Sequence, residues 1–258
     1  MTGPPGAGAR AADARDGGRG RLVSGLVVAL GCLLFLGGAG WGAIAYKPYS
    51  VPSDSMAPTL RQGARLLAQR IDGDEVRRGD VVIFRDPLWG QNLSMAKRVV
   101  AVGGDTVACC DRRGRLTVDG RPVEEPYLHA RGPASVTRFS ATVPADRLFV
   151  MGDHRADSVD SRAHLGDGAD GSIPRDAVRA RVDAVVWPLS DLGTVGRPDG
   201  FADLPGGVSQ PGPLRVILAL TTVGAALVLG GALYGPVARA AARRRARGRP
   251  RREAVAGG

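Results

Sequence analysis

Cysteine, lysine and aromatic residues are scarce in this chain of 258 residues. Its three cysteines show neither a CxxC pair nor the Cys/His spacing of a zinc site, so they predict no metal centre. Cys32 lies in an apolar run and is interpreted as a small hydrophobic residue. Cys109 and Cys110 are interpreted as two half-buried strand residues, because a bridge between neighbours would strain the backbone, although an external compartment would be able to oxidise them.

Lysine occurs only at Lys47 and Lys97, whereas the chain contains 33 arginines. Arginine stays protonated in proteins, but a buried lysine can lose its proton and act as a base. A lysine retained in so arginine-rich a chain is therefore a candidate for a role that arginine cannot fill.

The middle of the chain has no excess charge. The net charge of +10 suggests nucleic-acid binding at first, but residues 47–212 carry 22 basic and 22 acidic residues. The excess lies in the N-terminal flank (+2), at Arg215 (+1) and in the C-terminal tail (+7), beside two apolar segments. This distribution favours the positive-inside rule of membrane proteins over nucleic-acid binding, so we expect no nucleic-acid partner.

Two apolar segments are long enough to cross a lipid bilayer. Leu22–Tyr46 contains no charged residue, and about 20 residues span the ~30 Å hydrocarbon core. It is too long for an ordinary signal-peptide core, which favours a retained anchor with Trp41 and Tyr46 at the outer interface. Leu214–Tyr234 is a second candidate span.

These segments predict a two-pass protein of the cytoplasmic membrane. Both basic flanks predict cytoplasmic termini, with the intervening domain on the outer side. The expected parts are a disordered basic tail (1–21), a first transmembrane helix (22–46), an extracytoplasmic β-rich domain (47–192), a Gly/Pro-rich linker (193–212), a second transmembrane helix (213–235) and an Arg-rich tail (236–258).

No long amphipathic helix is predicted between the two apolar segments. Short runs rich in β-branched residues, separated by turn signals such as Asp119-Gly120, predict a mainly β, antiparallel domain. Residues 124–145 read as a loop. Strands are expected at 63–69, 81–84, 94–102, 106–110, 115–118, 147–151 and 183–187.

Two serines, Ser53 and Ser55, follow the first apolar segment directly. A serine hydroxyl is a weak nucleophile unless a base takes its proton. The base candidates for Ser55 are Lys97 and the histidines His129, His154 and His164. Burial would favour the neutral amine of a lysine. Strand alternation would place Lys97 on one face with the apolar residues Met95, Val99 and Ala101.

Four sequence blocks, in this order, closely resemble those of the bacterial type I signal peptidases. They are Pro52-Ser-Asp-Ser-Met56, Arg78-Gly-Asp-Val-Val82, Lys97-Arg-Val-Val-Ala-Val-Gly-Gly-Asp105 and Gly152-Asp-His-Arg-Ala-Asp-Ser-Val-Asp-Ser-Arg162. The resemblance extends from about Lys47 to Leu189. One such block would be weak evidence, whereas four in order after a membrane span are specific. It implies an antiparallel β-sheet peptidase domain with a small β-hairpin second lobe.

The resemblance also implies roles for individual residues. Ser55 matches the nucleophile and Lys97 the general base. Ser53 matches a hydroxyl that forms the oxyanion hole with the backbone N–H of Ser55, where each donor contributes about 3 kcal/mol. Ser158 matches the serine that orients the lysine, and Asp160 and Arg162 match a supporting pair.

The resemblance implies exported preproteins as substrates, cut after a small residue, with small residues preferred at positions −1 and −3. It places the enzyme in the lipid bilayer near the export translocon, and it implies no metal and no cofactor. Its substrate pockets match Val51, Met56, Leu60, Met95 and Ala96. His154 departs from the family pattern, which commonly has Asn there, and is interpreted as a tolerated loop substitution or, alternatively, as a pH-sensitive group near the site.

Three other hypotheses each account for part of the sequence. A non-enzymatic membrane protein that displays a β module for binding or scaffolding would be expected to lack a catalytic position, and none is missing. A self-cleaving repressor of related fold would need a DNA-binding domain, and residues 1–46 are a tail and an apolar segment. Self-cleavage after Ala45 is suggested by the small residues Ala43 and Ala45.

Overall fold

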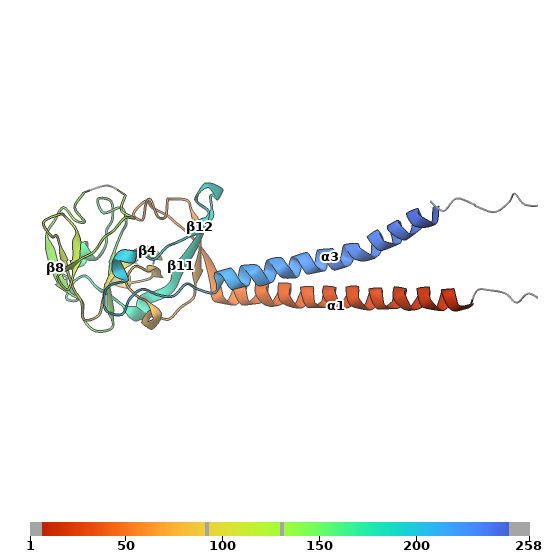
Figure 1. The fold of residues 1–258 in the computed structure, drawn as a ribbon. Coiled ribbons are helices and arrows are strands. Elements are labelled where there is room, and N and C mark those ends of the chain that lie inside the picture. Colours follow the sequence, from red (N-terminus) through yellow and green to blue (C-terminus); the bar gives the residue numbers. More distant parts are fainter. Residues whose placement is uncertain (1–6, 91–92, 130–131, 248–258) are drawn as a thin grey trace, which may run out of the picture. The chain divides into compact units, whose positions relative to one another are not determined.

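The computed structural model describes residues 7–90, 93–129 and 132–247, which fall into two compact units (Figure 1). One unit is helical and comprises Met1–Gly42 with Pro213–Gly258. The other is β-rich and comprises Ala43–Gly212. Every residue expected to carry chemistry lies in the β-rich unit.

The larger sheet of the β-rich unit has eight strands in the order β1-β2-β11-β3-β4-β9-β10, with β12 paired to β11. All of its strand pairs are antiparallel, which confirms the predicted fold class. Its strands are β1 (Tyr46–Ser50), β2 (Arg65–Gln69), β3 (Val81–Phe84), β4 (Met95–Val102), β9 (Arg147–Met151), β10 (Ile173–Pro174), β11 (Val178–Trp187) and β12 (Gly193–Thr194).

Short helical elements connect these strands. The α-helix α2 covers Pro87–Gly90, and single 3₁₀ turns cover Gly73–Glu75, Ser161–His164, Arg175–Ala177, Leu189–Asp191 and Asp199–Phe201.

Strand β3 shows that this sheet is covered on both faces. Successive side chains of a strand point to opposite faces, yet all four residues of β3 are buried. Val81 and Ile83 belong to one core cluster, whereas Val82 and Phe84 belong to another. The unbroken apolar run in the sequence therefore reflects core packing on both sides of the strand.

A β-bulge interrupts strand β4. Its pairing with β9 shifts register between Val99 and Ala101. Because a bulge sets two residues against one, Val100 and Ala101 both enter the core cluster shared with the second sheet. The prediction that Ala101 lies on one face with Lys97 was therefore wrong, while Met95 and Val99 pack together in a separate cluster.

The second sheet has four strands in the order β7-β6-β5-β8. Its strands are β5 (Thr106–Cys109), β6 (Leu116–Val118), β7 (Arg121–Pro122) and β8 (Phe139–Thr142). Asp119 and Gly120 have φ angles of 49° and 74°, as the tight turn between β6 and β7 requires. Strand β8 lies in the segment expected to be a loop, and it is held there by pairing with β5 and by burial of Phe139 and Ala141.

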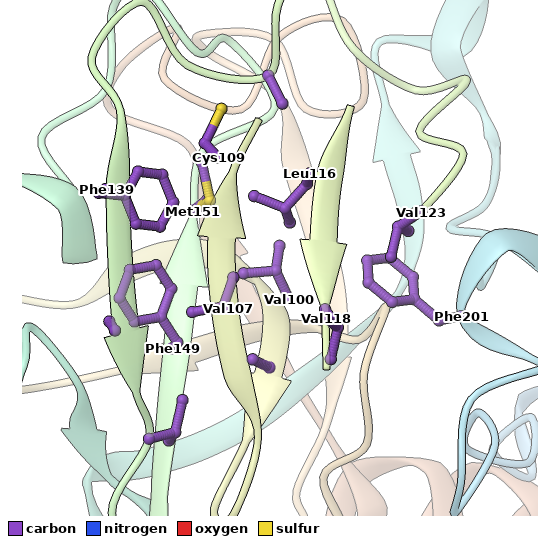
Figure 2. Packing of buried hydrophobic residues seen from close by; sticks show 14 of the residues in the cluster. Val100, Val107, Cys109, Leu116, Val118, Val123, Phe139, Phe149, Met151 and Phe201 are labelled. Atoms are coloured by element: carbon purple, nitrogen blue, oxygen red, sulfur yellow. The ribbon is translucent and has the colours of Figure 1, made fainter. Parts of the chain in front are cut away.

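A shared hydrophobic core holds the two sheets together (Figure 2). The larger sheet contributes Val100 and Phe149, and the second sheet contributes Val107 and Leu116, all with no exposed surface. The rings of Phe139 and Phe149 stack with centroids 5.7 Å apart. The second lobe is therefore a packed continuation of the main core.

Cys109 and Cys110, expected to be two half-buried strand residues that an external compartment would be able to oxidise, are joined by a disulfide bond. The peptide between them is cis, and their Cα atoms are 3.0 Å apart. Both sulfur atoms lie 3.7 Å from the carbonyl oxygen of Ser135. Cys32 is a free, exposed thiol.

The segment 193–212, expected to be a linker, packs against the β-rich unit instead. Val195, Phe201 and Leu204 are buried, and Phe201 has no exposed surface. The glycines and prolines of this segment therefore serve tight turns and close packing rather than freedom of movement.

The helical unit contains α1 (Ala7–Ala45) and α3 (Leu214–Arg247). From Ala7 onward the expected disordered tail is helical, and residues 1–6 and 248–258 lie outside the described residues. Tyr46 starts β1 instead of ending the helix. Its side chain is buried in the β-rich unit, and its hydroxyl donates to Asp183 at 2.8 Å. Leu22–Ala45 and Leu214–Tyr234 are long and apolar enough to cross a membrane.

Glycines allow α1 and α3 to approach closely in antiparallel orientation. An added Cβ at Gly224 would lie 2.4 Å from the backbone nitrogen of Phe35, and one at Gly31 would lie 2.8 Å from that of Val228. Ser24 Oγ donates to the carbonyl oxygen of Gly231 at 2.8 Å. Small residues permit such close backbone contact in apolar helix pairs.

Substitution of Gly224 by leucine is expected to separate the two helices, because its side chain would collide with the backbone of α1. Gly230→Leu is the matched control on the same helix, since nothing lies within 4 Å of its Cβ position. The distance between spin labels, one on each helix, measures the change. Equal distances in both variants would contradict this packing.

Candidate active site

A closed loop from Val51 to Ala64, here called the serine loop, carries Ser53 and Ser55. Val51 starts the loop, and Gly63 N donates to its carbonyl oxygen at 2.9 Å, while Val51 N donates to the carbonyl oxygen of Ala64 at 2.9 Å. These two hydrogen bonds fasten the ends of the loop to each other, so the two serines lie on a short, fixed segment.

Side chains within this loop hold its backbone on both sides of Ser55. Asp54 Oδ1 accepts a hydrogen bond from Gln62 N at 3.0 Å. Gln62 Nε2 donates to the carbonyl oxygen of Pro52 at 3.0 Å. The peptide before Pro58 is cis, which completes a compact turn after the serines. Ser53 Oγ then lies 3.4 Å from Ser55 Oγ, as a hydrogen-bond donor.

Lys97 lies on β4 and reaches Ser55 directly. Its Nζ donates to Ser55 Oγ at 2.8 Å, although 42 residues separate them in the chain. Only 5% of Lys97 is exposed. Burial lowers the pKa of Lys97 most strongly; the carboxylate of Asp160 raises it and the charge of Arg162 lowers it again. The balance favours the neutral amine relative to a free lysine.

The loop after β9 supports Ser55 from its backbone side. The backbone N–H of His154 donates to the carbonyl oxygen of Ser55 at 3.1 Å. A Cβ at Gly152 would lie 2.4 Å from that carbonyl oxygen and 2.2 Å from Ser158 Oγ. Glycine at this position is therefore needed to let the two loops meet.

A buried ion pair joins β4, the serine loop and the loop after β9. Arg98 Nη2 lies 2.7 Å from Asp153 Oδ2, and their side chains are 2% and 0% exposed. Thr59 Oγ1 donates to the same Asp153 oxygen at 2.6 Å. The guanidinium carbon of Arg98 also lies 4.0 Å from the centre of the Tyr127 ring. Asp153 thus connects Arg98, the neighbour of Lys97, to Thr59 in the loop that carries Ser55.

Asp160 and Arg162 form the predicted pair. Arg162 donates from Nε and Nη2 to the two carboxylate oxygens of Asp160, both at 2.8 Å. Asp160 also accepts from Gly152 N at 3.0 Å. Burial raises the pKa of Asp160, but the hydrogen bonds and charge of Arg162 outweigh it and bring the pKa below its ordinary value. Asp160 is therefore ionised near Lys97.

Ser158 is the residue that the resemblance implied would orient Lys97. Its hydroxyl is buried beside Gly152, and no hydrogen bond joins it to Lys97 within the described residues. In this arrangement the one side-chain hydrogen bond of the Lys97 amine among those residues goes to Ser55.

The histidines do not compete for Ser55. The rings of His129 and His154 pack against each other with centroids 4.1 Å apart. His164 pairs with Asp167 at 2.7 Å and stacks on Trp89. Across the described ranges no imidazole is hydrogen-bonded to the Ser55 hydroxyl, which leaves Lys97 as the base candidate.

A cleft of about 480 Å³ opens over this pair. It is bounded by the serine loop, the start of β4 and the loop after β9. Its lining residues are Pro52, Ser53, Ser55, Ser94, Met95, Ala96, Lys97, Ala156, Asp157, Ser158 and Val159.

Two of the five predicted pocket residues, Met95 and Ala96, line the cleft. Val51, Met56 and Leu60 do not line it; they are buried in the core cluster against which Ala96 packs. A sequence cannot distinguish an apolar residue in a pocket wall from one in the core below, because both need the same side-chain chemistry.

Sequence reasoning also missed several residues that build the site. Arg98 and Asp153 belong to the matching blocks, but nothing in their spacing shows that they pair. Thr59 follows the serines and carried no signal. Asp157 and Val159 line the cleft on either side of Ser158, which was named, so proximity in the sequence was the available clue.

Comparison with known proteins identifies the family of this chain. The family model described as signal peptidase, peptidase S26, matches residues 21–187. Signal peptidase I of Mycobacterium tuberculosis is 35% identical over 199 residues, which cover 58% of this chain and 67% of the relative. Signal peptidase I of Bacillus licheniformis is 37% identical over 160 residues, covering 58% and 81%.

A solved signal peptidase I from Enterococcus faecalis is 27% identical, covers 41% of this chain and 94% of its own, and superimposes with a TM-score of 0.33. The family assignment rests on the sequence comparisons, because the family model matches more than half of the chain. This chain belongs to the signal peptidase family, peptidase S26, and is a serine peptidase.

Proposed function

We propose that this protein is a membrane-anchored endopeptidase that removes N-terminal signal peptides from exported preproteins, with Ser55 as nucleophile and neutral Lys97 as general base. The observation that carries the proposal is the 2.8 Å hydrogen bond from Lys97 Nζ to Ser55 Oγ at the floor of an open cleft. A buried amine of lowered pKa is suited to accept the proton of a serine hydroxyl.

In the proposed reaction Lys97 takes the proton of Ser55 while Oγ attacks the carbonyl carbon after the −1 residue. The tetrahedral intermediate collapses as Lys97 donates that proton to the leaving amine, which leaves an acyl ester on Ser55. Water then attacks the ester with Lys97 again as base, and the released acid is the cleaved signal peptide. Ionised Asp160, held by Arg162, stabilises the charged amine formed between these steps.

The oxyanion would be stabilised by Ser53 Oγ and the backbone N–H of Ser55. The hydroxyl of Ser53 is 3.4 Å from Ser55 Oγ, and so it is available beside the developing charge. The role of Ser158 in orienting Lys97 stays a prediction.

An extended substrate fits the open edge of β4. This strand pairs with β3 through Met95–Arg98, whereas its pairing with β9 starts only at Arg98. In an antiparallel ladder the N–H and C=O of Ala96 then point away from β3, toward the cleft. The small side chain of Ala96 and the half-buried Met95 leave room for small residues at −1 and −3.

Membrane anchoring is the proposed role of the two apolar helices. Their windows Leu22–Ala45 and Leu214–Tyr234 suit two spans, and the basic flanks favour cytoplasmic termini. The β-rich unit would then act on the outer side of the cytoplasmic membrane, near the translocon from which signal peptides emerge. Anchoring would raise the effective concentration of substrate at the site.

Cleavage of a preprotein with an Ala-x-Ala site tests this function. Wild-type protein is expected to cut after the second Ala, and Ser55→Ala is expected to be inactive because the attacking atom is missing. Ser190→Ala is the matched control, since that serine is not one of the cleft-lining residues and its hydroxyl donates to Asp191. Equal processing by wild type and Ser55→Ala would instead favour a non-enzymatic binding module.

A second preprotein with a bulky residue at −1 tests the specificity. It is expected to be a poor substrate, because the family resemblance implies a preference for small residues at this position. Efficient cleavage of that substrate would contradict the preference for small residues while leaving the catalytic pair intact.

A further inference from the structure

Residues 195–209 form a segment, here called the C-terminal strap, that lies beyond the last residue matched by the family model, Trp187. Its first end is tied to β11. Val195 N donates to the carbonyl oxygen of Asp183 at 2.9 Å, and Arg197 Nη2 donates to Asp183 Oδ1 at 3.1 Å.

The middle of the C-terminal strap is anchored in the core between the two sheets. Phe201 has no exposed surface and belongs to the same cluster as Val123, beside which it lies in Figure 2. Gly200 passes so close to the second lobe that a Cβ would lie 2.2 Å from the carbonyl oxygen of Glu124. This segment is therefore built into the fold.

The C-terminal strap forms hydrogen bonds with the turn Arg78–Asp80. This turn belongs to a sequence block to which the proposed reaction gives no role. Arg78 Nη1 donates to the carbonyl oxygen of Pro205 at 2.6 Å. The Ser209 hydroxyl donates to Asp80 Oδ1 and accepts from Arg197 Nε at 2.7 Å. Burial raises the pKa of Asp80 and the hydrogen bond from Ser209 lowers it, so Ser209 compensates part of the cost of the buried carboxylate.

The same turn holds the strand that carries Lys97. Val99 N donates to the carbonyl oxygen of Asp80 at 2.9 Å, and Gly79 N donates to that of Val99 at 2.8 Å. Arg98 Nη1 donates to the carbonyl oxygen of Gly79 at 2.8 Å. Arg98 and Val99, the two residues that follow Lys97, are thus held by hydrogen bonds to the turn that the C-terminal strap contacts.

We propose that the C-terminal strap is a positioning element of the active site, in which Ser209 and Phe201 hold the Arg78–Asp80 turn and so keep Lys97 buried against Ser55. The proposal rests on the proposed function for its catalytic consequence, but it makes a claim about Lys97 that is measured without substrate. Neither residue of the strap lines the cleft.

The pKa of Lys97 in the full-length protein in detergent provides the test. The chain contains two lysines, so ¹³C labelling of lysine Cε gives two signals, and Lys97→Arg identifies them. Ser209→Ala is expected to let water reach the amine and to raise the Lys97 pKa by about one unit, which leaves about tenfold less neutral amine at a given pH below it. The rising limb of the kcat/KM profile is expected to move to higher pH, with KM unchanged. Ser209→Thr, which keeps the hydroxyl, is expected to restore both.

Phe139→Ala is the matched structural control for Phe201→Ala. Both remove a buried ring from the same core cluster. Phe201 lies against the turn, with its Cδ2 atom 3.2 Å from the position of a Cβ at Gly79, whereas Phe139 lies on β8 and stacks on Phe149. Only Phe201→Ala is expected to shift the Lys97 pKa. An unchanged Lys97 pKa in Ser209→Ala, or equal shifts in the two phenylalanine variants, would overturn the proposal. Failure of the proposed function would appear separately, as full activity of Ser55→Ala.

Discussion

Replacement of Lys97 by methionine is expected to abolish proteolysis and at the same time to stabilise the folded protein at neutral pH. Methionine has a similar length but no proton acceptor, so Ser55 loses its base and kcat/KM falls by about 10⁴-fold or more. The same change removes a buried amine. Burial in the folded protein disfavours the protonated form of that amine, which costs folding free energy.

The sign of the stability effect follows from the pKa shift. Burial lowers the folded-state pKa of Lys97 below its ordinary value of 10.5. Between these two values the unfolded chain binds a proton that the folded chain does not, so wild-type stability rises with pH across that window. Below the folded-state pKa, the free-energy cost of burying the Lys97 amine is fully present, and above pH 10.5 this cost has vanished. The gain from Lys97→Met is therefore largest at low and neutral pH and disappears at high pH.

Urea unfolding at several pH values, together with preprotein cleavage, measures both effects. Lys47→Met is the control, because Lys47 is the exposed lysine of the pair and lies on β1. It is expected to change neither activity nor stability to a comparable extent. Measurable activity in Lys97→Met, or a loss of stability that is the same at all pH values, would show that Lys97 is not a desolvated base.

Replacement of Asp153 by asparagine is expected to destabilise the β-rich unit by about 3–5 kcal/mol, because it leaves the buried guanidinium of Arg98 without its counter-charge. Asp153 receives two hydrogen bonds from Arg98, at 2.9 and 2.7 Å, and one from Thr59. Its side chain has no exposed surface, so water cannot replace the lost charge.

Urea unfolding again provides the measurement, with Asp191→Asn as the control. Asp191 lies 3.8 Å from Arg61, whose side chain is 65% exposed, and such surface pairs contribute less than about 1 kcal/mol. The double change Arg98→Met with Asp153→Leu is expected to recover part of the loss, since both buried charges are then absent. Equal effects of Asp153→Asn and Asp191→Asn would contradict a dominant role for the buried pair.

The contact between Ser55 and Lys97, the proposed catalytic pair, could be anticipated from the sequence because composition and motif order pointed to these two residues independently. Lys97 was conspicuous as one of two lysines among 33 arginines, and Ser55 occupied a matching block. The structure brings the two together across 42 residues, as β4 and the serine loop converge. Strand positions such as Val81–Phe84 were also predictable, since β-branched runs have few alternatives.

Other features of the fold and the site could not be predicted from the sequence, for physical reasons. Arg98 and Asp153 look like ordinary surface charges in a sequence, since only the fold reveals that they are buried together. Met56 and Leu60 have the composition of a pocket wall, but they form the core below it. The bulge after Val99 shifts the alternation of β4 without any glycine or proline to mark it. Glycine and proline are equally typical of flexible linkers and of tight packing, so residues 193–212 were misassigned.

The burial of Phe201 has a practical consequence for the preparation of a soluble enzyme. A version shortened to the family match would end at Trp187 and leave an apolar hole between the two sheets, with the carboxylate of Asp80 deprived of Ser209. Removal of the apolar helices at the unit boundaries, after Gly42 and before Pro213, would keep both contacts. Inhibitor screening on a soluble form would accordingly need the chain through Gly212.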